Sequence, residues 1–268
     1  MLVQRSYVLT VAFICVAALL CAAAAAPTRA AEPSLLKAEN LRCEFRVDPL
    51  GIDVPRPRLS WNLTSPRRAQ RQTAYQVLVA SSAGPLARGA GDLWDSGKVA
   101  SDRAVHVAYA GTPLASAQQC FWSLRVWDGD DRPSAWSPPA SWTMGLLSQD
   151  DWQAKWITAD GAVPADKAGH TSTLLRRELR AKPGLRRALV FVCGLGQYEL
   201  TVNGRKSGND LLAPGWTGYR KTCLYDTHDV TAMLREGENA LGLILGNGMY
   251  NVVGGRYAKY TGSMGPQK

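Results

Sequence analysis

Side chains suited to holding a sugar are concentrated between residues 203 and 257. Aromatic rings stack on the C–H faces of a sugar, and planar amides pair with its neighbouring hydroxyl groups. The aromatic candidates are Trp216, Tyr219, Tyr250 and Tyr257, and the amide candidates are Asn203, Asn247 and Asn251. This pattern favours carbohydrate binding and supplies no catalytic group.

These candidates also have structural interpretations. Asn203-Gly204 is a strong hairpin signal, because Gly tolerates a positive φ and Asn tolerates the left-handed region. The turn alone would account for Asn203. Trp216 and Tyr219 lie in a Pro-Gly-Trp loop, which could instead pack on its own domain or on a neighbouring one. Both interpretations stay open from the sequence.

No catalytic constellation is predicted elsewhere. Asp128, Asp130 and Asp131 lie in a predicted hairpin turn, where Asp is common. Asp150 and Asp151 are expected to cap a short turn. The histidines show no metal-ligand spacing and are expected to have structural roles. They are His106, His170 and His228.

The candidate binding residues belong to a predicted β domain at residues 173–268. Strands are expected at residues 174–180, 188–193, 198–203, 222–225 and 240–245. An Asn-Gly turn, a long loop and a short helical turn separate the later ones. This order is typical of a jelly roll (a galactose-binding-like β-sandwich). A jelly roll needs about eight strands, so the domain is expected to be incomplete at its C-terminal end.

Residues 35–147 contain about seven short β-type runs separated by turn residues, the pattern of a β-sandwich. The runs lie at residues 39–47, 58–64, 74–80, 93–97, 104–109, 120–127 and 140–144. We expect a fibronectin type III-like or immunoglobulin-like domain here, which makes the chain all-β.

Residues 148–172 are predicted to join the two domains. Trp152 and Trp156 stand four residues apart, which would place both on one face of a short helical turn. Because residues 148–157 contain no Gly or Pro, a semi-rigid interface is favoured over a floppy linker.

The N-terminal segment, residues 1–31, has the features of a secretory signal peptide. Arg5 precedes an uncharged apolar run from Tyr7 to Ala26 that ends in small residues. The run is also about as long as a membrane-spanning helix, roughly 20 residues, so an uncleaved anchor is the alternative. The protein is expected to be exported, to the periplasm or outside the cell.

The formal net charge is +9, yet the basic residues are dispersed. The one dense basic cluster, at 176–187, has no interleaved aromatic residue, so nucleic acid is not an expected partner. A solvated face is expected there, with attraction to an acidic polysaccharide as the alternative.

Four cysteines follow the N-terminal segment, with a spacing that fits no disulfide framework or metal site. Cys43 and Cys120 alternate with apolar residues and are expected to be small, buried core residues. Cys193 and Cys223 are the other two, and pairing stays open for an exported protein.

Several motifs occur in linked order along the chain. The upstream ones are Pro57-Arg-Leu-Ser-Trp61, Gln72-Thr-Ala-Tyr75-Gln-Val and Trp94-Asp-Ser96-Gly97. The later ones are Trp152-Gln-Ala-Lys-Trp156-Ile157, Tyr198-Glu-Leu-Thr-Val-Asn203-Gly204, Leu212-Ala-Pro214-Gly215-Trp216-Thr-Gly-Tyr219 and Gly246-Asn247-Gly248-Met-Tyr250. Together they resemble the N-terminal region of bacterial α-L-rhamnosidases of glycoside hydrolase family 78.

This resemblance implies that an (α/α)6 barrel outside the chain carries the carboxylates that hydrolyse terminal α-L-rhamnose with inversion. The chain would then be an N-terminal fragment, inactive by itself, with that barrel and rhamnose-containing glycans as partners. A related rhamnose-binding module, of carbohydrate-binding family 67, holds rhamnose with calcium. Asn209 and Asp210 are therefore candidate calcium ligands; no cofactor is otherwise required.

Three other functions fit parts of the pattern. A stand-alone carbohydrate-binding module would need a complete second domain. A fibronectin-like surface adhesin would show tandem repeats of one domain, whereas the two halves share no period. Another exo-glycosidase with a similar jelly roll would lack the linked Pro-Gly-Trp and Gly-Asn-Gly-Met-Tyr motifs.

Overall fold

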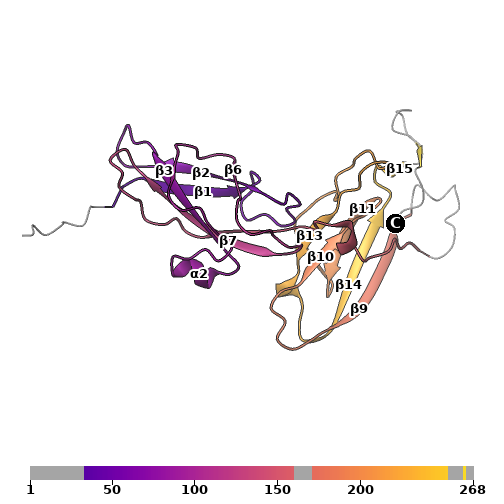
Figure 1. Ribbon diagram of the computed structural model, residues 1–268. Helices are drawn as coiled ribbons and strands as arrows, with labels where there is room; N and C mark the ends of the chain where they lie inside the picture. Colours follow the sequence, from indigo (N-terminus) through magenta and orange to yellow (C-terminus); the bar gives the residue numbers. More distant parts are fainter. Residues whose placement is uncertain (1–32, 160–170, 253–261, 264–268) are drawn as a thin grey trace, which may run out of the picture.

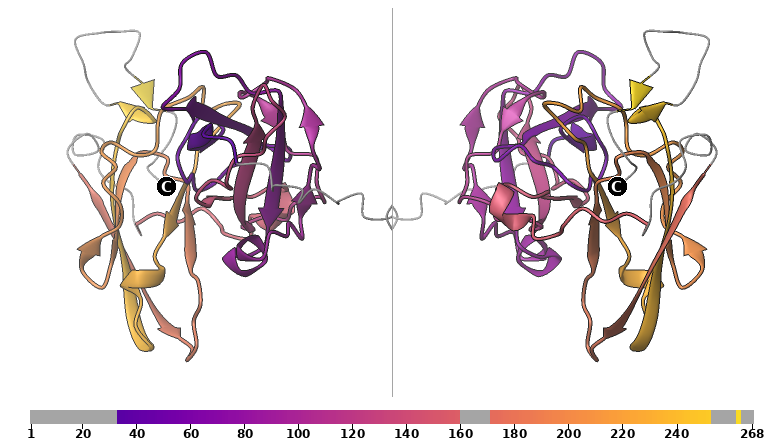
Figure 2. Two further views of the ribbon diagram at one scale, coloured as in Figure 1. Left: turned by 90° about the vertical axis from the view of Figure 1, so that its left-hand side faces the viewer. Right: turned by 90° about the vertical axis from the view of Figure 1, so that its right-hand side faces the viewer.

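The computed structural model describes residues 33–159, 171–252 and 262–263. Two β-sandwiches follow one another, the first in indigo to magenta and the second in orange to yellow (Figure 1). The end-on views of Figure 2 show them as two separate bodies. The expected all-β architecture is confirmed, and α2 (Ala83–Ala87) is the one α-helix within the described residues. The predicted signal segment lies outside those residues.

The first sandwich packs two antiparallel sheets. One has the order β1-β2-β6, and the other has the order β4-β3-β7-β8 with β5 paired to β3. The strands are β1 (Lys37–Cys43), β2 (Arg58–Thr64), β3 (Ala74–Ala80), β4 (Trp94–Asp95), β5 (Val99–Ala100), β6 (Val107–Ala108), β7 (Gln119–Trp127) and β8 (Ala140–Thr143). The expected strand at 39–47 ends earlier, because the chain turns at Glu44 and Phe45, which have positive φ.

The core of the first sandwich lies between these sheets. Along β7, alternate residues from Cys120 to Val126 are fully buried, with Trp122 among them. Trp61 and Trp142 contribute their rings from β2 and β8. The period-2 alternation of the sequence therefore identifies the core face of this strand, as predicted.

The second sandwich packs a four-stranded sheet, β12-β11-β14-β9, against the two-stranded sheet β10-β13. The strands are β9 (Thr173–Ala181), β10 (Leu189–Val192), β11 (Gln197–Val202), β12 (Arg205–Lys206), β13 (Asp226–Asp229) and β14 (Gly237–Gly246), and β15 (Asn251–Val252) pairs with β16 (Gly262–Ser263). A 3₁₀ turn, η3 (Thr231–Met233), precedes β14.

The predicted Asn-Gly turn joins β11 to β12. Asn203 and Gly204 have φ angles of 50° and 78°, the left-handed values that a two-residue hairpin turn requires. Val202 consequently pairs with Arg205 across the hairpin and with Leu241 on β14.

The prediction of a strand at 222–225 is wrong, because β13 begins only at Asp226. The Lys221 and Thr222 backbone N–H groups bond back to the Gly218 carbonyl, at 2.7 and 3.2 Å. These local bonds use donors that a ladder would need. The Tyr225 side chain is directed to the first sandwich instead.

The helical face predicted for Trp152 and Trp156 is also wrong. The 3₁₀ turn η1 (Gln149–Asp151) is closed by a capping box, in which the Asp151 carboxylate accepts the Ser148 backbone N–H at 3.0 Å. Trp152 then leaves the turn with extended backbone angles. Its ring packs on Tyr225 at 5.7 Å between centroids, whereas Trp156 is 50% exposed.

The two sandwiches touch directly. The Tyr225 hydroxyl accepts the Leu146 backbone N–H at 2.8 Å, and Arg187 donates to Thr143 Oγ1 at 2.5 Å. A Cβ added at Gly145 would overlap the Tyr225 hydroxyl, so glycine permits the close approach. These contacts support the semi-rigid interface expected from the sequence. Within the described ranges, no helix is long and apolar enough to cross a membrane.

Candidate functional site

The aromatic loop, residues 211–225, joins β12 to β13 and presents apolar side chains to solvent. Leu211 is 82% exposed and Trp216 is 61% exposed. The base of the loop is fixed, because the buried Ala213 accepts a 2.7 Å hydrogen bond from the Tyr198 backbone N–H. Apolar side chains held outward on an anchored loop are typical of a binding surface.

Tyr219 and Tyr250 meet edge to face, with ring centroids 5.2 Å apart and ring planes at 89°. Tyr219 belongs to the aromatic loop, and Tyr250 follows β14. The contact joins two segments that are distant in sequence and fixes the orientation of both rings. Each ring is half-buried and keeps part of its surface accessible.

Two predicted amides lie on the same turn as Tyr250. The Asn251 side-chain amide donates to Asn247 Oδ1 at 3.2 Å, and the Asn251 backbone N–H donates to the Asn247 carbonyl at 3.3 Å. Asn251 is buried, whereas Asn247 is half-buried. The structure thus brings Tyr219, Tyr250 and Asn247 together, while Tyr257 lies outside the described residues.

Asn203 lies at the other end of β14. Its side-chain amide donates to the Met233 carbonyl and to Asn239 Oδ1, and its Oδ1 accepts the Ala240 backbone N–H, all within 2.9 to 3.0 Å. Asn247 lies seven positions after Ala240, just past the end of β14, a span of roughly 23 Å at about 3.3 Å per residue. Asn203 is therefore not gathered with the tyrosine pair, and its polar atoms are used within the fold.

Asn209 and Asp210 follow β12 and are exposed. Calcium takes six to eight oxygen ligands, and no group of three or more His, Cys, Asp or Glu side chains suited to a metal occurs in the described part of the chain. The residues present fit a calcium site poorly. Calcium at this loop stays a prediction.

A polar cluster that sequence reasoning missed lies inside the second sandwich. The Tyr198 hydroxyl donates to Asp226 Oδ2 at 2.8 Å and contacts His228 Nε2 at 2.9 Å. Ser207 Oγ lies 3.3 Å from His228 Nδ1. Asp226 and His228 stand two residues apart on β13, a spacing that puts both on one face and was visible in the sequence.

The surroundings of this cluster favour the uncharged forms of His228 and Tyr198. Burial lowers the pKa of His228, although Asp226 and Asp210 oppose the shift. Burial, followed by the hydrogen bond to Asp226, raises the pKa of Tyr198. Asp226 bonds the tyrosine rather than the histidine, and Ser207 is 5% exposed. The arrangement therefore stabilises the packing of β13 on β11 and lacks the geometry of a nucleophilic triad.

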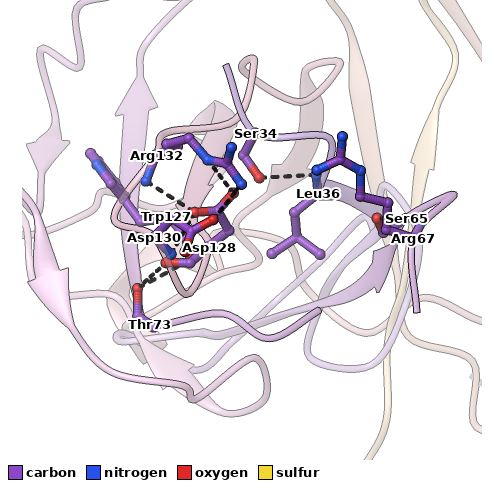
Figure 3. A network of polar contacts seen from close by, with 9 residues as sticks. All are labelled: Ser34, Leu36, Ser65, Arg67, Thr73, Trp127, Asp128, Asp130 and Arg132. Atoms are coloured by element: carbon purple, nitrogen blue, oxygen red, sulfur yellow. Dashed lines mark hydrogen bonds and ion pairs between the residues drawn. The ribbon is translucent and has the colours of Figure 1, made fainter. Parts of the chain in front are cut away.

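Asp128 and Asp130, which follow β7, lie with Arg132 in a closed turn, shown in Figure 3. The Asp128 carboxylate accepts the backbone N–H groups of Asp130 and Arg132 at 3.0 and 3.1 Å, and Arg132 Nε at 3.1 Å. Burial raises the pKa of Asp128, but hydrogen bonds from Ser34 and Arg132 outweigh it, so the net pKa is lowered. The carboxylates stabilise the turn, as predicted.

The remaining predicted residues have structural settings. His106 is exposed and packs edge-on against Phe45 at 5.1 Å, and His170 lies outside the described residues. Cys43 and Cys120 are buried, as predicted, and burial raises the pKa of Cys120 to about 12.

Comparison with known proteins gives both sandwiches a family. The family model described as "Rha78A-like, N-terminal immunoglobulin domain" matches residues 38–148, and "Alpha-L-rhamnosidase N-terminal domain" matches residues 184–267. The chain belongs to the α-L-rhamnosidase family and corresponds to the N-terminal domains of its members. The second match contains the aromatic loop, the tyrosine pair and the polar cluster around His228.

Named relatives agree with the family. The α-L-rhamnosidase of Formosa agariphila is 35% identical over 223 residues, which cover 76% of this chain and 23% of that protein. The α-L-rhamnosidase structure from Dictyoglumus thermophilum is 37% identical, with a TM-score of 0.72 over 82% of this chain and 26% of that one. The Aspergillus terreus structure is 28% identical, with a TM-score of 0.73 over 82% and 25%. The chain thus spans only about a quarter of the length of these relatives.

Proposed function

We propose that the chain is the N-terminal accessory part of an exported α-L-rhamnosidase, an enzyme that hydrolyses terminal α-L-rhamnose with inversion. The supporting observation is that both sandwiches, in order, match N-terminal domains of this family. The apolar run after Arg5 supports export.

The carboxylate pair that performs hydrolysis is proposed to lie in an (α/α)6 barrel outside residues 1–268. Inversion needs two carboxyl groups roughly 6.5–9.5 Å apart with room for a water molecule. The Asp128 carboxylate accepts hydrogen bonds within its own turn, and the Asp226 carboxylate accepts one from the Tyr198 hydroxyl. The described α-helix, α2, is five residues long, far shorter than the helices of such a barrel.

The aromatic loop is proposed to hold a rhamnose-containing glycan or glycoside. Trp216 offers an exposed ring, the rings of Tyr219 and Tyr250 meet edge to face, and Asn247 lies three residues before Tyr250 on the same turn. Aromatic rings and a planar amide suit the C–H surface and the hydroxyl pair of a deoxy sugar. The same loop could instead pack on the proposed barrel, because Leu211 and Leu212 are also exposed.

A hydrolysis assay tests the enzymatic part of this proposal. We expect no nitrophenol release from an aryl α-L-rhamnoside by the chain alone, and release by a longer polypeptide that adds the proposed barrel. Turnover by the chain alone that is abolished by substituting one of its own residues would overturn the assignment.

Affinity electrophoresis in a gel containing a rhamnose-rich polysaccharide tests the binding part. We expect the chain to be retarded and Trp216→Ala to migrate freely. Trp156→Ala is the matched control, since Trp156 is also exposed but lies outside the aromatic loop. Retardation of all three proteins to the same extent would contradict a binding role for Trp216.

A further inference from the structure

Two cysteines lie at the facing ends of neighbouring strands in the second sandwich. Cys193 is the first residue after β10, and Cys223 lies three residues before β13. β10 and β13 are antiparallel, with Val192 opposite Asp226. Phe191 and Tyr225 meet across these two segments with ring centroids 6.0 Å apart, so the chain just before β13 stays beside the end of β10. Cys193 and Cys223 therefore lie at the same end of the β10–β13 pair.

The electrostatics of the two thiols agree with this placement. Cys193 and Cys223 lie close enough for Cys223 to add to the effect of burial in raising the pKa of Cys193, and Cys223 Sγ lies 4.0 Å from the Tyr219 carbonyl oxygen. Cys193 is half-buried and Cys223 is exposed. One thiol is thus open to a reagent in solution, and the second lies next to it.

The other two described cysteines provide a contrast within the same chain. Cys43 and Cys120 also lie near enough to interact electrostatically. Both are buried in the core of the first sandwich, at 1% and 0% exposure. A dissolved disulfide reagent cannot reach either thiol without unfolding, so this pair is expected to stay reduced.

We propose that Cys193 and Cys223 form a disulfide that fastens the aromatic loop to the end of β10. The oxidant is a disulfide donor, such as oxidised glutathione. The exposed Cys223 thiolate attacks the donor, releases one reduced thiol and forms a mixed disulfide; the Cys193 thiolate then attacks the Cys223 sulfur and releases the second. The two protein thiols lose two hydrogens in total, and one donor disulfide becomes two thiols.

This link has a consequence for the surface that carries Trp216 and Tyr219. Both residues lie between Cys193 and Cys223 in the sequence, so the disulfide closes a covalent loop around them. Closing a loop removes conformations from the unfolded chain and restrains the attached segment. Burial raises the pKa of Cys193 to about 11, so ring closure is expected to become faster as pH rises.

Peptide mapping of the full chain tests the proposal. The protein is equilibrated with a large excess of oxidised glutathione, its free thiols are alkylated in denaturant, and it is digested with trypsin. Cleavage at Arg187, Arg205, Lys221 and Arg235 separates the two cysteines into peptides 188–205 and 222–235. We expect these peptides to be joined, with a mass two hydrogens below their sum, and to separate on reduction. Cys43 and Cys120 are expected to be recovered alkylated.

A variant and two alternative results complete the test. In Cys223→Ser, the 188–205 peptide is expected to be recovered alkylated or as a glutathione adduct. Recovery of Cys193 and Cys223 in the wild-type chain as free thiols, or as separate glutathione adducts, at equilibrium would overturn the proposal. A link between Cys193 and any other cysteine would overturn it as well. The wild-type result decides the question even if the variant folds poorly.

Discussion

The two sandwiches use their apolar residues differently. The first buries a continuous cluster that includes Val77, Trp122, Leu124 and Trp142, each at no more than 1% exposure. In the second, the described buried cluster consists of Tyr198, Leu200, Ala213 and Leu245.

The second sandwich also buries a polar cluster beside its apolar residues and exposes several large apolar side chains. Asp226 and His228 face inward with Tyr198, while Leu174, Leu211 and Trp216 are 61–82% exposed. A fold needs its apolar groups inside for stability. The first sandwich therefore has the larger described core, whereas the second places large apolar side chains on the loop that we propose as a recognition surface.

Truncation of one leucine in each core is the strongest way to break this comparison. We expect Leu124→Ala to lower the free energy of unfolding by about 3–5 kcal/mol, and Leu200→Ala by about 2 kcal/mol, since a sparse core leaves a smaller additional cavity. Urea unfolding, with hydrogen exchange to assign each loss to its sandwich, measures both. Equal losses would contradict the difference in packing.

A substitution at the contact between the sandwiches is expected to have the next largest effect. Gly145→Ala forces the Tyr225 hydroxyl away and should cost about 1–3 kcal/mol. Gly218→Ala is the matched control, because no atom lies within 4 Å of the added Cβ. Hydrogen exchange at Leu146 should rise in the first variant and stay unchanged in the second. An unchanged rate in Gly145→Ala would show that the two sandwiches are not coupled there.

Asn203→Ala sharpens the distinction between structural and binding residues within the second sandwich. Loss of the three side-chain hydrogen bonds to Met233, Asn239 and Ala240 leaves partners unsatisfied and should cost about 1–3 kcal/mol. Glycan binding should be retained in the folded variant. Asn209→Ala, at an exposed position, is the control and should leave stability unchanged. Loss of binding without loss of stability in Asn203→Ala would restore Asn203 as a sugar ligand.

The buried polar cluster predicts a smaller, pH-dependent effect. Because burial lowers the pKa of His228 from its ordinary 6.5, the unfolded chain binds a proton before the folded one does. Stability should therefore fall as pH drops below about 6.5. The pKa values of the Asp128 and Asp229 carboxyls are lowered from 3.8. The stability that these two carboxylates contribute is therefore lost only at lower pH.

Unfolding measured at pH 7.5 and at pH 5 checks this expectation. His228→Gln should remove the difference between the two values in the second sandwich, since glutamine does not titrate. A slope that persists in the variant would assign the pH dependence to another group.

The sequence predicted what depends on local pattern. Strands β2 and β3 begin and end where the alternation of their residues indicates, and the Asn-Gly turn has the predicted φ angles. Non-local contacts decided the rest. Tyr225 does not lie in the expected strand at 222–225. Its side chain instead contacts Leu146 and Trp152, which follow the first sandwich and are distant in sequence.

The candidate site shows the same division. Residue types alone identified Trp216, Tyr219 and Tyr250 as candidates, but the edge-to-face contact of the two tyrosines depends on how β14 delivers Tyr250. The setting of Asn203 required the three-dimensional position of Asn239. Residue type can nominate a binding group, whereas tertiary packing determines which groups meet.

Calorimetric titration of L-rhamnose into the folded chain tests the proposed sugar-binding role of the aromatic loop most directly, first with calcium and then with a chelator. The account predicts saturable heat that is lost in Trp216→Ala and retained in Trp156→Ala; loss of that heat on chelation would show that binding requires calcium. Absence of heat from a well-folded wild-type chain would contradict the account and make the exposed loop a packing surface for the proposed barrel.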